Sequence, residues 1–177
     1  DLHQVLRLFL TAARNNVVVA PRVLERIRQS TSDFSRVLDA ECSRLFMAIL
    51  EPRGCLGATL RAMYETGVLE VVLPEFSRVR CLLQFNAYHS YTVDEHTLRA
   101  MSIIESFEQE SGPVGAAYRE IKLKPVLHLA MLLHDVGKGS VEDHSELGRS
   151  IAERIAVRLG LTEPQRQLLM FLIHKHL

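Results

Sequence analysis

An apolar helix that ends in a histidine and an aspartate is the feature that most constrains this fold. Pro125 and Gly137 are favoured start and stop residues on either side of a segment that is apolar all round. A helix without a polar face is expected at the centre of a domain. His134 and Asp135, adjacent at its end, would be buried there at a cost of several kcal/mol unless something pairs with both. A divalent metal ion is the obvious partner, because imidazole and carboxylate are its usual ligands.

Helical periodicity runs along the whole chain, and no alternating pattern typical of strands persists. Apolar periodicity, with the residues that start and stop helices, predicts helices over residues 2–14, 21–28, 34–50 and 57–66, then turns and a short helix over 69–80. They predict further helices over residues 92–110, 125–133, 143–160 and from 162 to the end, with Gly112-Pro113 as the clearest break. We therefore expect an all-α fold, in which a bundle of four helices follows a smaller helical layer.

Three capping boxes mark helix starts in the second half of the chain. They are Thr92 with Glu95, Asp143 with Glu146, and Thr162 with Gln165.

Composition excludes several classes of partner. Lys+Arg and Asp+Glu number 21 each, and no basic run stands out, so we expect no nucleic-acid partner. No apolar stretch is long enough to span a bilayer, so we expect no membrane partner. Cys42, Cys55 and Cys81 are an odd set without paired spacing, which favours reduced thiols and a cytoplasmic location.

Seven of the eight histidines lie after residue 88, and their helical phase matters more than their number. Three share a face with apolar residues: His96 with Ala100, Ile103 and Phe107, His144 with Leu147, Gly148 and Ile151, and His176 with Leu169, Leu172 and Ile173. With His134 and Asp135, polar groups on four helices are thus predicted to point inward. Metal sites in helical bundles are built in this way.

The remaining histidines have simpler interpretations. We expect His128 either to pack within the apolar helix or to support the ligands from behind. We expect His3 to lie on the surface and His174 to lie off the inward face. His89, in the string Tyr88-His89-Ser90-Tyr91, would either line the mouth of a cleft or pack there.

Such a site suits metal-assisted hydrolysis of a phosphodiester or phosphomonoester, because a divalent ion activates water and polarises a phosphoryl oxygen. Asp135 would bridge two ions or orient the attacking water, and Lys138 would neutralise charge on the phosphoryl oxygens. His144 and His176 would hold a second ion. Mixed imidazole and carboxylate ligands suit Mg, Mn, Fe or Zn.

Three ordered motifs resemble the HD-domain metal-dependent phosphohydrolases. They are Asp-Glu-His-Thr-Leu at 94–98, Leu-His-Asp-Val-Gly-Lys-Gly at 133–139 and Asp-His-Ser-Glu-Leu-Gly at 143–148. The longer string over 85–98 is more specific, and it closely resembles the HD region of bacterial bifunctional uridylyltransferase/uridylyl-removing enzymes. Residues 67–76 and the terminal His176-Leu177 are similar to the same family, so the resemblance covers nearly the whole chain.

The resemblance implies an HD-domain helical bundle with an N-terminal helical extension. It also implies hydrolysis of the uridylylated PII nitrogen-signalling protein, releasing UMP and restoring a tyrosine hydroxyl, with glutamine as an effector sensed by domains outside this chain. By position, His96, His134 and Asp135 would be metal ligands, His144 and His176 candidates for a second ion, and Lys138 a phosphate contact.

Two departures from the family pattern shape the domain prediction. HD domains complete their site with a further downstream aspartate, but Asp143 is the last aspartate here, so we expect that ligand to lie beyond Leu177. No Gly-Ser with paired aspartates marks a nucleotidyltransferase. We therefore expect a helical connecting region over residues 1–80 and a truncated HD domain over 81–177, excised from a larger protein.

Two alternatives remain open. The first is another HD hydrolase that acts on nucleotides, although the absence of a basic signal disfavours a tRNA-linked version. The second is a non-catalytic helical module that binds PII, which the missing final aspartate would favour.

Overall fold

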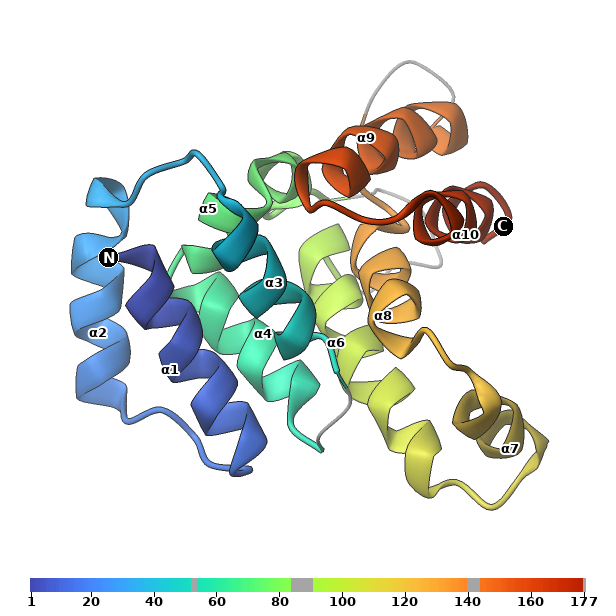
Figure 1. Cartoon of the computed structure of the whole chain (residues 1–177), viewed down its shortest axis with the longest axis horizontal. Helices are drawn as coiled ribbons and strands as arrows, with labels where there is room; N and C mark the ends of the chain where they lie inside the picture. The colour runs from blue at the N-terminus through green and yellow to red at the C-terminus, as the bar shows by residue number, and fades with distance from the viewer. Residues whose placement is uncertain (52–53, 84–90, 140–143, 177) are drawn as a thin grey trace.

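A computed structural model describes residues 1–51, 54–83, 91–139 and 144–176, without the side chains of residues 144 and 145. These residues form helices and turns and contain no strand, which confirms the predicted all-α fold (Figure 1). The α-helices are α1 (Leu2–Arg14), α2 (Pro21–Ser30), α3 (Ala40–Ile49), α4 (Leu56–Glu65), α5 (Val68–Val72), α6 (Val93–Ser106), α7 (Pro113–Glu120), α8 (Lys124–Leu133), α9 (His144–Arg158) and α10 (Glu163–His174). Short 3-10 helices cover Thr31–Asp33, Pro74–Val79 and Phe107–Gln109.

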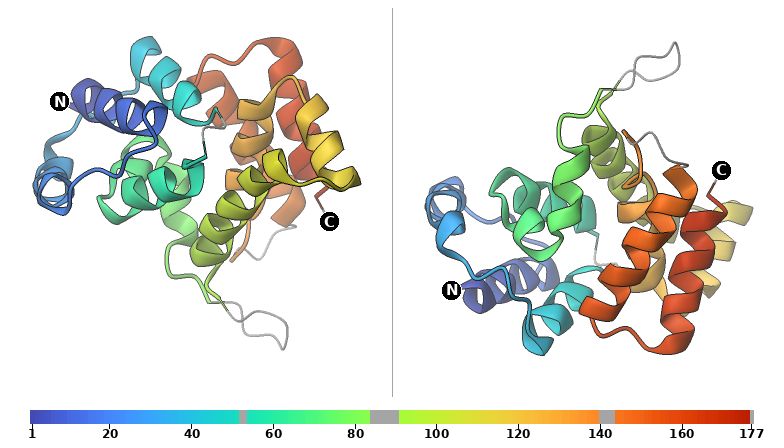
Figure 2. Two further views of the ribbon diagram at one scale, coloured as in Figure 1. Left: turned by 90° about the horizontal axis from the view of Figure 1, so that it is seen from below. Right: turned by 90° about the horizontal axis from the view of Figure 1, so that it is seen from above.

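Helices α1–α5 form an N-terminal layer, and α6–α10 form a C-terminal bundle beside it (Figures 1 and 2). Helix α4 packs on α6 where the two parts meet, while α8 packs between α6 and α10. The apolar helix α8 is therefore central, as its sequence predicts. Buried side chains from both parts, among them Phe46, Leu60, Met101, Leu129 and Ile155, form one continuous core.

Several polar links cross between the layer and the bundle, among them those of Glu105 and Arg158. Glu105 of α6 is buried, and its carboxylate accepts hydrogen bonds from the backbone N–H groups of Gly54 at 2.7 Å and Leu56 at 2.6 Å. It thus supplies acceptors for the first N–H groups at the start of α4. Arg158 of α9 donates two hydrogen bonds to the carboxylate of Glu75, at 2.6 and 2.7 Å. The two parts are thereby fixed to each other by more than apolar contact.

Several predicted helix boundaries are wrong. The helix expected over 34–50 begins at Ala40, because Asp39 caps it by accepting a hydrogen bond from the Cys42 N–H at 2.8 Å. The predicted break at Gly112-Pro113 is present, but it is followed by α7, a helix that was not predicted and that begins at Pro113. Helix α8 ends at Leu133, and the left-handed residue that follows is Gly139, with φ of 79°, rather than Gly137.

The capping boxes have mixed outcomes. The box at Thr162 is confirmed, since the Gln165 side chain accepts a hydrogen bond from the Thr162 N–H at 2.9 Å. Thr92 is the N-cap of α6, but the Glu95 side chain bonds to Arg61 and Arg99 instead. Asp143 lies outside the described residues. No helix in the described part of the chain has the length and hydropathy needed to cross a bilayer.

Candidate metal centre

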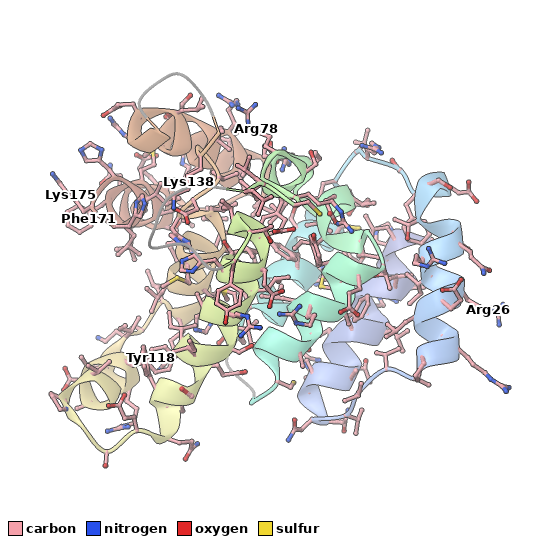
Figure 3. The ribbon with its side chains drawn as sticks, turned by 180° about the vertical axis from the view of Figure 1, so that it is seen from behind. Arg26, Arg78, Tyr118, Lys138, Phe171 and Lys175 are labelled. Carbon is pink, nitrogen blue, oxygen red and sulfur yellow. The ribbon has the colours of Figure 1, made fainter. Side chains whose placement is uncertain are left out.

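The end of α8 and the turn after it place the two central side chains of the site. His134 is the C-cap residue of α8, and two tight turns follow it. In the first, the Val136 N–H donates to the Leu133 carbonyl, and in the second, the Lys138 N–H donates to the Asp135 carbonyl, both at 3.0 Å. These turns leave Asp135 only 3% exposed. They also return Lys138 toward it, beside α10 (Figure 3).

Side chains from three parts of the chain meet at Asp135. One ligand atom each of His96, His134 and Asp135 lies within 4.8 Å of the others. The Nε2 atom of His134 is 3.2 Å from Oδ2 of Asp135, and Nε2 of His176 is 3.8 Å from Oδ1. The His134 ring lies 5.5 Å, centre to centre, from the rings of both His96 and His176.

Backbone carbonyls set the tautomer of two of these histidines. Nδ1 of His134 lies 2.7 Å from the Met131 carbonyl oxygen, and Nδ1 of His176 makes the same kind of contact with the Ile173 carbonyl. A carbonyl only accepts, so in each neutral ring Nδ1 carries the proton and Nε2 carries the lone pair. Both lone pairs are on the nitrogens nearest Asp135. This is the arrangement in which a second hydrogen bond orients a metal-ligating histidine.

Asp135 is held as a carboxylate. Burial alone would raise its pKa, but a hydrogen bond from the His134 ring and the Lys138 ammonium, whose Nζ lies 2.8 Å from Oδ2, keep that pKa well below its ordinary value. A bound ion would take the place of the hydrogen between Nε2 of His134 and the carboxylate, and Nε2 would then present its lone pair to the ion. A buried ionised carboxylate faced by two imidazole lone pairs is a donor set that fits a divalent cation. His96, His134 and Asp135 would hold the ion, with His176 beside them.

The predicted orientation of His96 is wrong, although its place at the site is supported. The stripe expected to face inward includes Ile103, which is 57% exposed, and His96 is itself exposed. The buried face of α6 carries instead Val93, Asp94, Thr97, Leu98, Met101, Ile104 and Glu105. The apolar side chains of that face join the core where α6 packs on α4 and α8, and this packing determines the rotation of the helix. His96 therefore reaches the site from the rim.

The other predicted ligands have different outcomes. His176 lies beyond the end of α10 rather than on it, yet it contacts Asp135. His144 is the first residue of α9, but its side chain is outside the described residues, so the second ion site stays a prediction.

The histidines not assigned to the site also have identifiable surroundings. His128 is fully buried, with Nδ1 at 2.6 Å from the Leu50 carbonyl and Nε2 at 2.7 Å from the Tyr118 hydroxyl, which confirms a packing role. His3 lies at the surface, where Nε2 contacts Asp39 at 2.7 Å. His174 lies 3.6 Å from Glu146. His89 is outside the described residues.

Asp94 is a buried site residue whose role the sequence did not indicate. Its carboxylate accepts hydrogen bonds from the N–H groups of Cys81 at 2.8 Å and Glu95 at 2.9 Å, and from the Tyr64 hydroxyl. Burial opposes ionisation, but these bonds hold the pKa of Asp94 below its ordinary value. Asp94 thus fixes the start of α6, two residues before His96. The available signal was an acidic residue in the first helical turn.

His3, Asp39 and Cys42 form another group of potential metal ligands. Asp39 already caps α3, and burial raises the pKa of the Cys42 thiol to about 11. The thiol is therefore protonated, and helix capping accounts for this group.

The sequence that carries this site is similar to known proteins. Residues 93–177 match the HD domain family. The chain is 39% identical to the bifunctional uridylyltransferase/uridylyl-removing enzyme of Azospirillum brasilense, over 98% of this chain and 19% of that protein. It is 39% identical to the enzyme of the same name from Nitrobacter winogradskyi and 36% identical to that from Ruegeria pomeroyi, each over 100% of this chain and 20% of the relative. The chain thus spans about a fifth of the length of the curated relatives it matches.

Proposed function

Since residues 93–177 match the HD domain family and the chain is similar along its length to bifunctional uridylyltransferase/uridylyl-removing enzymes, we propose that it removes UMP from uridylylated PII. The match to the HD domain supports a metal-dependent hydrolase, and the substrate is part of the proposal. The observation that carries the proposal is the buried Asp135 carboxylate, faced by the Nε2 atoms of His134 and His176 and by the Lys138 ammonium.

The reaction would be hydrolysis of the phosphodiester between UMP and a tyrosyl oxygen. Oxygen from water bonds to phosphorus, the bond from phosphorus to the tyrosyl oxygen breaks, and that oxygen takes up a proton. When bound, a divalent ion supplies Lewis acidity to the phosphoryl group and lowers the pKa of water.

The residues of the chain have distinct roles in this proposal. His96, His134 and Asp135 hold the ion, and Asp135 accepts a hydrogen bond from the attacking water. Lys138 moves from Asp135 to a phosphoryl oxygen of the substrate. His144 and His176 are proposed for a second ion.

The wider setting is part of the same proposal. Residues 81–177 would form the HD domain and residues 1–80 a connecting helical region. Glutamine would act through domains outside this chain, in the cytoplasm, without a nucleic-acid or membrane partner.

The test is release of UMP from uridylylated PII, with Mn²⁺, by a copy of the protein that extends past Leu177 and so includes the downstream aspartate expected there. We expect turnover by the wild type and none by Asp135→Ala, while Arg26→Ala, an exposed change on α2, keeps wild-type turnover (Figure 3). Turnover of free nucleotides with none of uridylylated PII would support a different HD hydrolase. Binding of PII without any turnover would support the non-catalytic module.

A further inference from the structure

An aromatic ring and a guanidinium group lie together on the exposed side of α6, next to His96. Cζ of Arg99 is 4.2 Å from the centre of the Tyr91 ring. Tyr91 is 47% exposed, and the Arg99 side chain is 52% exposed. The Tyr91–Arg99 pair therefore presents flat, solvent-accessible surface of mixed aromatic and cationic character.

Ion pairs fix this pair in place. Nε of Arg99 donates to Oε1 of Glu95 at 2.6 Å. Glu95 in turn accepts two hydrogen bonds from Arg61 of α4, at 3.0 and 3.2 Å. The hydrogen bonds from Arg61, with that from Arg99, hold the pKa of Glu95 below its ordinary value, so the anchor stays charged. An exposed arginine held this way is ordered before any ligand arrives, which lowers the entropic cost of binding.

The pair is close to the candidate metal centre. Arg99 follows His96 by three residues, and residues three apart are neighbours on a helix surface, with about 5–6 Å between Cβ atoms. His96 reaches toward His134 at one side of this face. A ligand whose phosphate lies at the metal centre would therefore extend over Arg99 and Tyr91.

We propose that the Tyr91–Arg99 pair binds the pyrimidine base of the nucleotide that is released, an inference that rests on the proposed function. Bases stack on aromatic rings and on guanidinium planes. In a nucleotide the ribose joins base to phosphate, so a base on the pair and a phosphate at the metal centre can belong to one ligand.

The hydrogen-bond donors of Arg99 favour the base over the tyrosyl ring of the protein substrate. The bond to Glu95 uses Nε, and among the described residues no acceptor is found for the Nη groups. Pyrimidine carbonyl oxygens accept from such donors, whereas a tyrosyl ring has no carbonyl group.

Two diesters with the same leaving group test this role. The p-nitrophenyl ester of UMP contains the base, and methyl p-nitrophenyl phosphate lacks it. We expect Tyr91→Ala to raise KM about tenfold for the UMP ester, with little change in kcat. The same change should leave KM and kcat for methyl p-nitrophenyl phosphate unchanged. Tyr91→Phe keeps the ring and should restore the wild-type KM. Phe171→Ala, which removes an exposed aromatic side chain from α10, should change neither KM (Figure 3).

Equal effects of Tyr91→Ala on both esters, or no effect on either, would overturn the inference and leave the proposed function standing. If the wild type hydrolyses neither ester, release of UMP from uridylylated PII still decides the proposed function, and calorimetry with Mn²⁺ tests the pair directly. The wild type should bind UMP about tenfold more tightly than ribose 5-phosphate, and Tyr91→Ala should bind them equally. Equal binding of the two by the wild type would overturn the inference.

Discussion

Replacing Glu105 tests the link between α6 and the start of α4. Its buried carboxylate accepts hydrogen bonds from the N–H groups of Gly54 and Leu56. In Glu105→Gln one side-chain oxygen remains, so one N–H loses its acceptor and faces an amide N–H₂ group. A buried donor left without an acceptor costs about 1–3 kcal/mol. Glu105→Ala leaves both N–H groups without the carboxylate and removes side-chain volume, so we expect a loss of about 3–5 kcal/mol.

Urea unfolding at pH 7, followed by far-UV circular dichroism, measures both losses of unfolding free energy. Glu153→Ala is the matched control, because Glu153 is an exposed glutamate on α9, and we expect it to change stability by less than about 0.5 kcal/mol. The reasoning is refuted if Glu105→Gln unfolds within about 0.5 kcal/mol of the wild type.

Three further predictions concern the turn after α8, the buried histidine and the metal centre. Gly139→Ala should destabilise the protein more than Gly160→Ala in thermal unfolding: both residues have positive φ, but only at Gly139 would a Cβ meet a side chain, at 2.9 Å. Equal losses would contradict this steric argument. Burial lowers the pKa of His128 in the folded protein, so below about pH 6.5 the unfolded state binds more protons than the folded state. His128 therefore makes the folded protein less stable as pH falls. The stability difference between wild type and His128→Gln should therefore shrink from pH 7 to pH 5, and parallel profiles would disprove it. His134→Ala and Asp135→Ala should each abolish metal binding, measured by elemental analysis, while circular dichroism stays helical; unchanged metal content in both would remove the site assignment.

Local signals in the sequence were enough to predict the central helix and its two polar end residues. The apolar surface of α8, its early proline and the adjacent His134 and Asp135 all lie within one short segment. The Thr162 capping box was predictable for the same reason, because its partners are three residues apart.

Features that depend on distant partners were not predictable in this way. Residue 105 bonds to a residue 51 positions earlier, and nothing near Glu105 in the sequence indicates that contact. The rotation of α6, and with it the exposure of His96, depends on which of two apolar stripes fits α4 and α8. Pro113 is compatible with both a break and a helix start, and its neighbours did not decide between them.

The candidate ligands come from three separate parts of the chain: α6, the end of α8 and the residues after α10. An ion that joins them would therefore act as a reversible cross-link between segments about 40 residues apart, comparable in its effect on the unfolded chain to closing two loops. Ligand linkage gives such an ion about 2.7 kcal/mol of stabilisation at a hundred times its Kd. The folding stability of this domain would then vary with the supply of free metal around it, so the ion that serves the chemistry would also determine how much of the protein is folded.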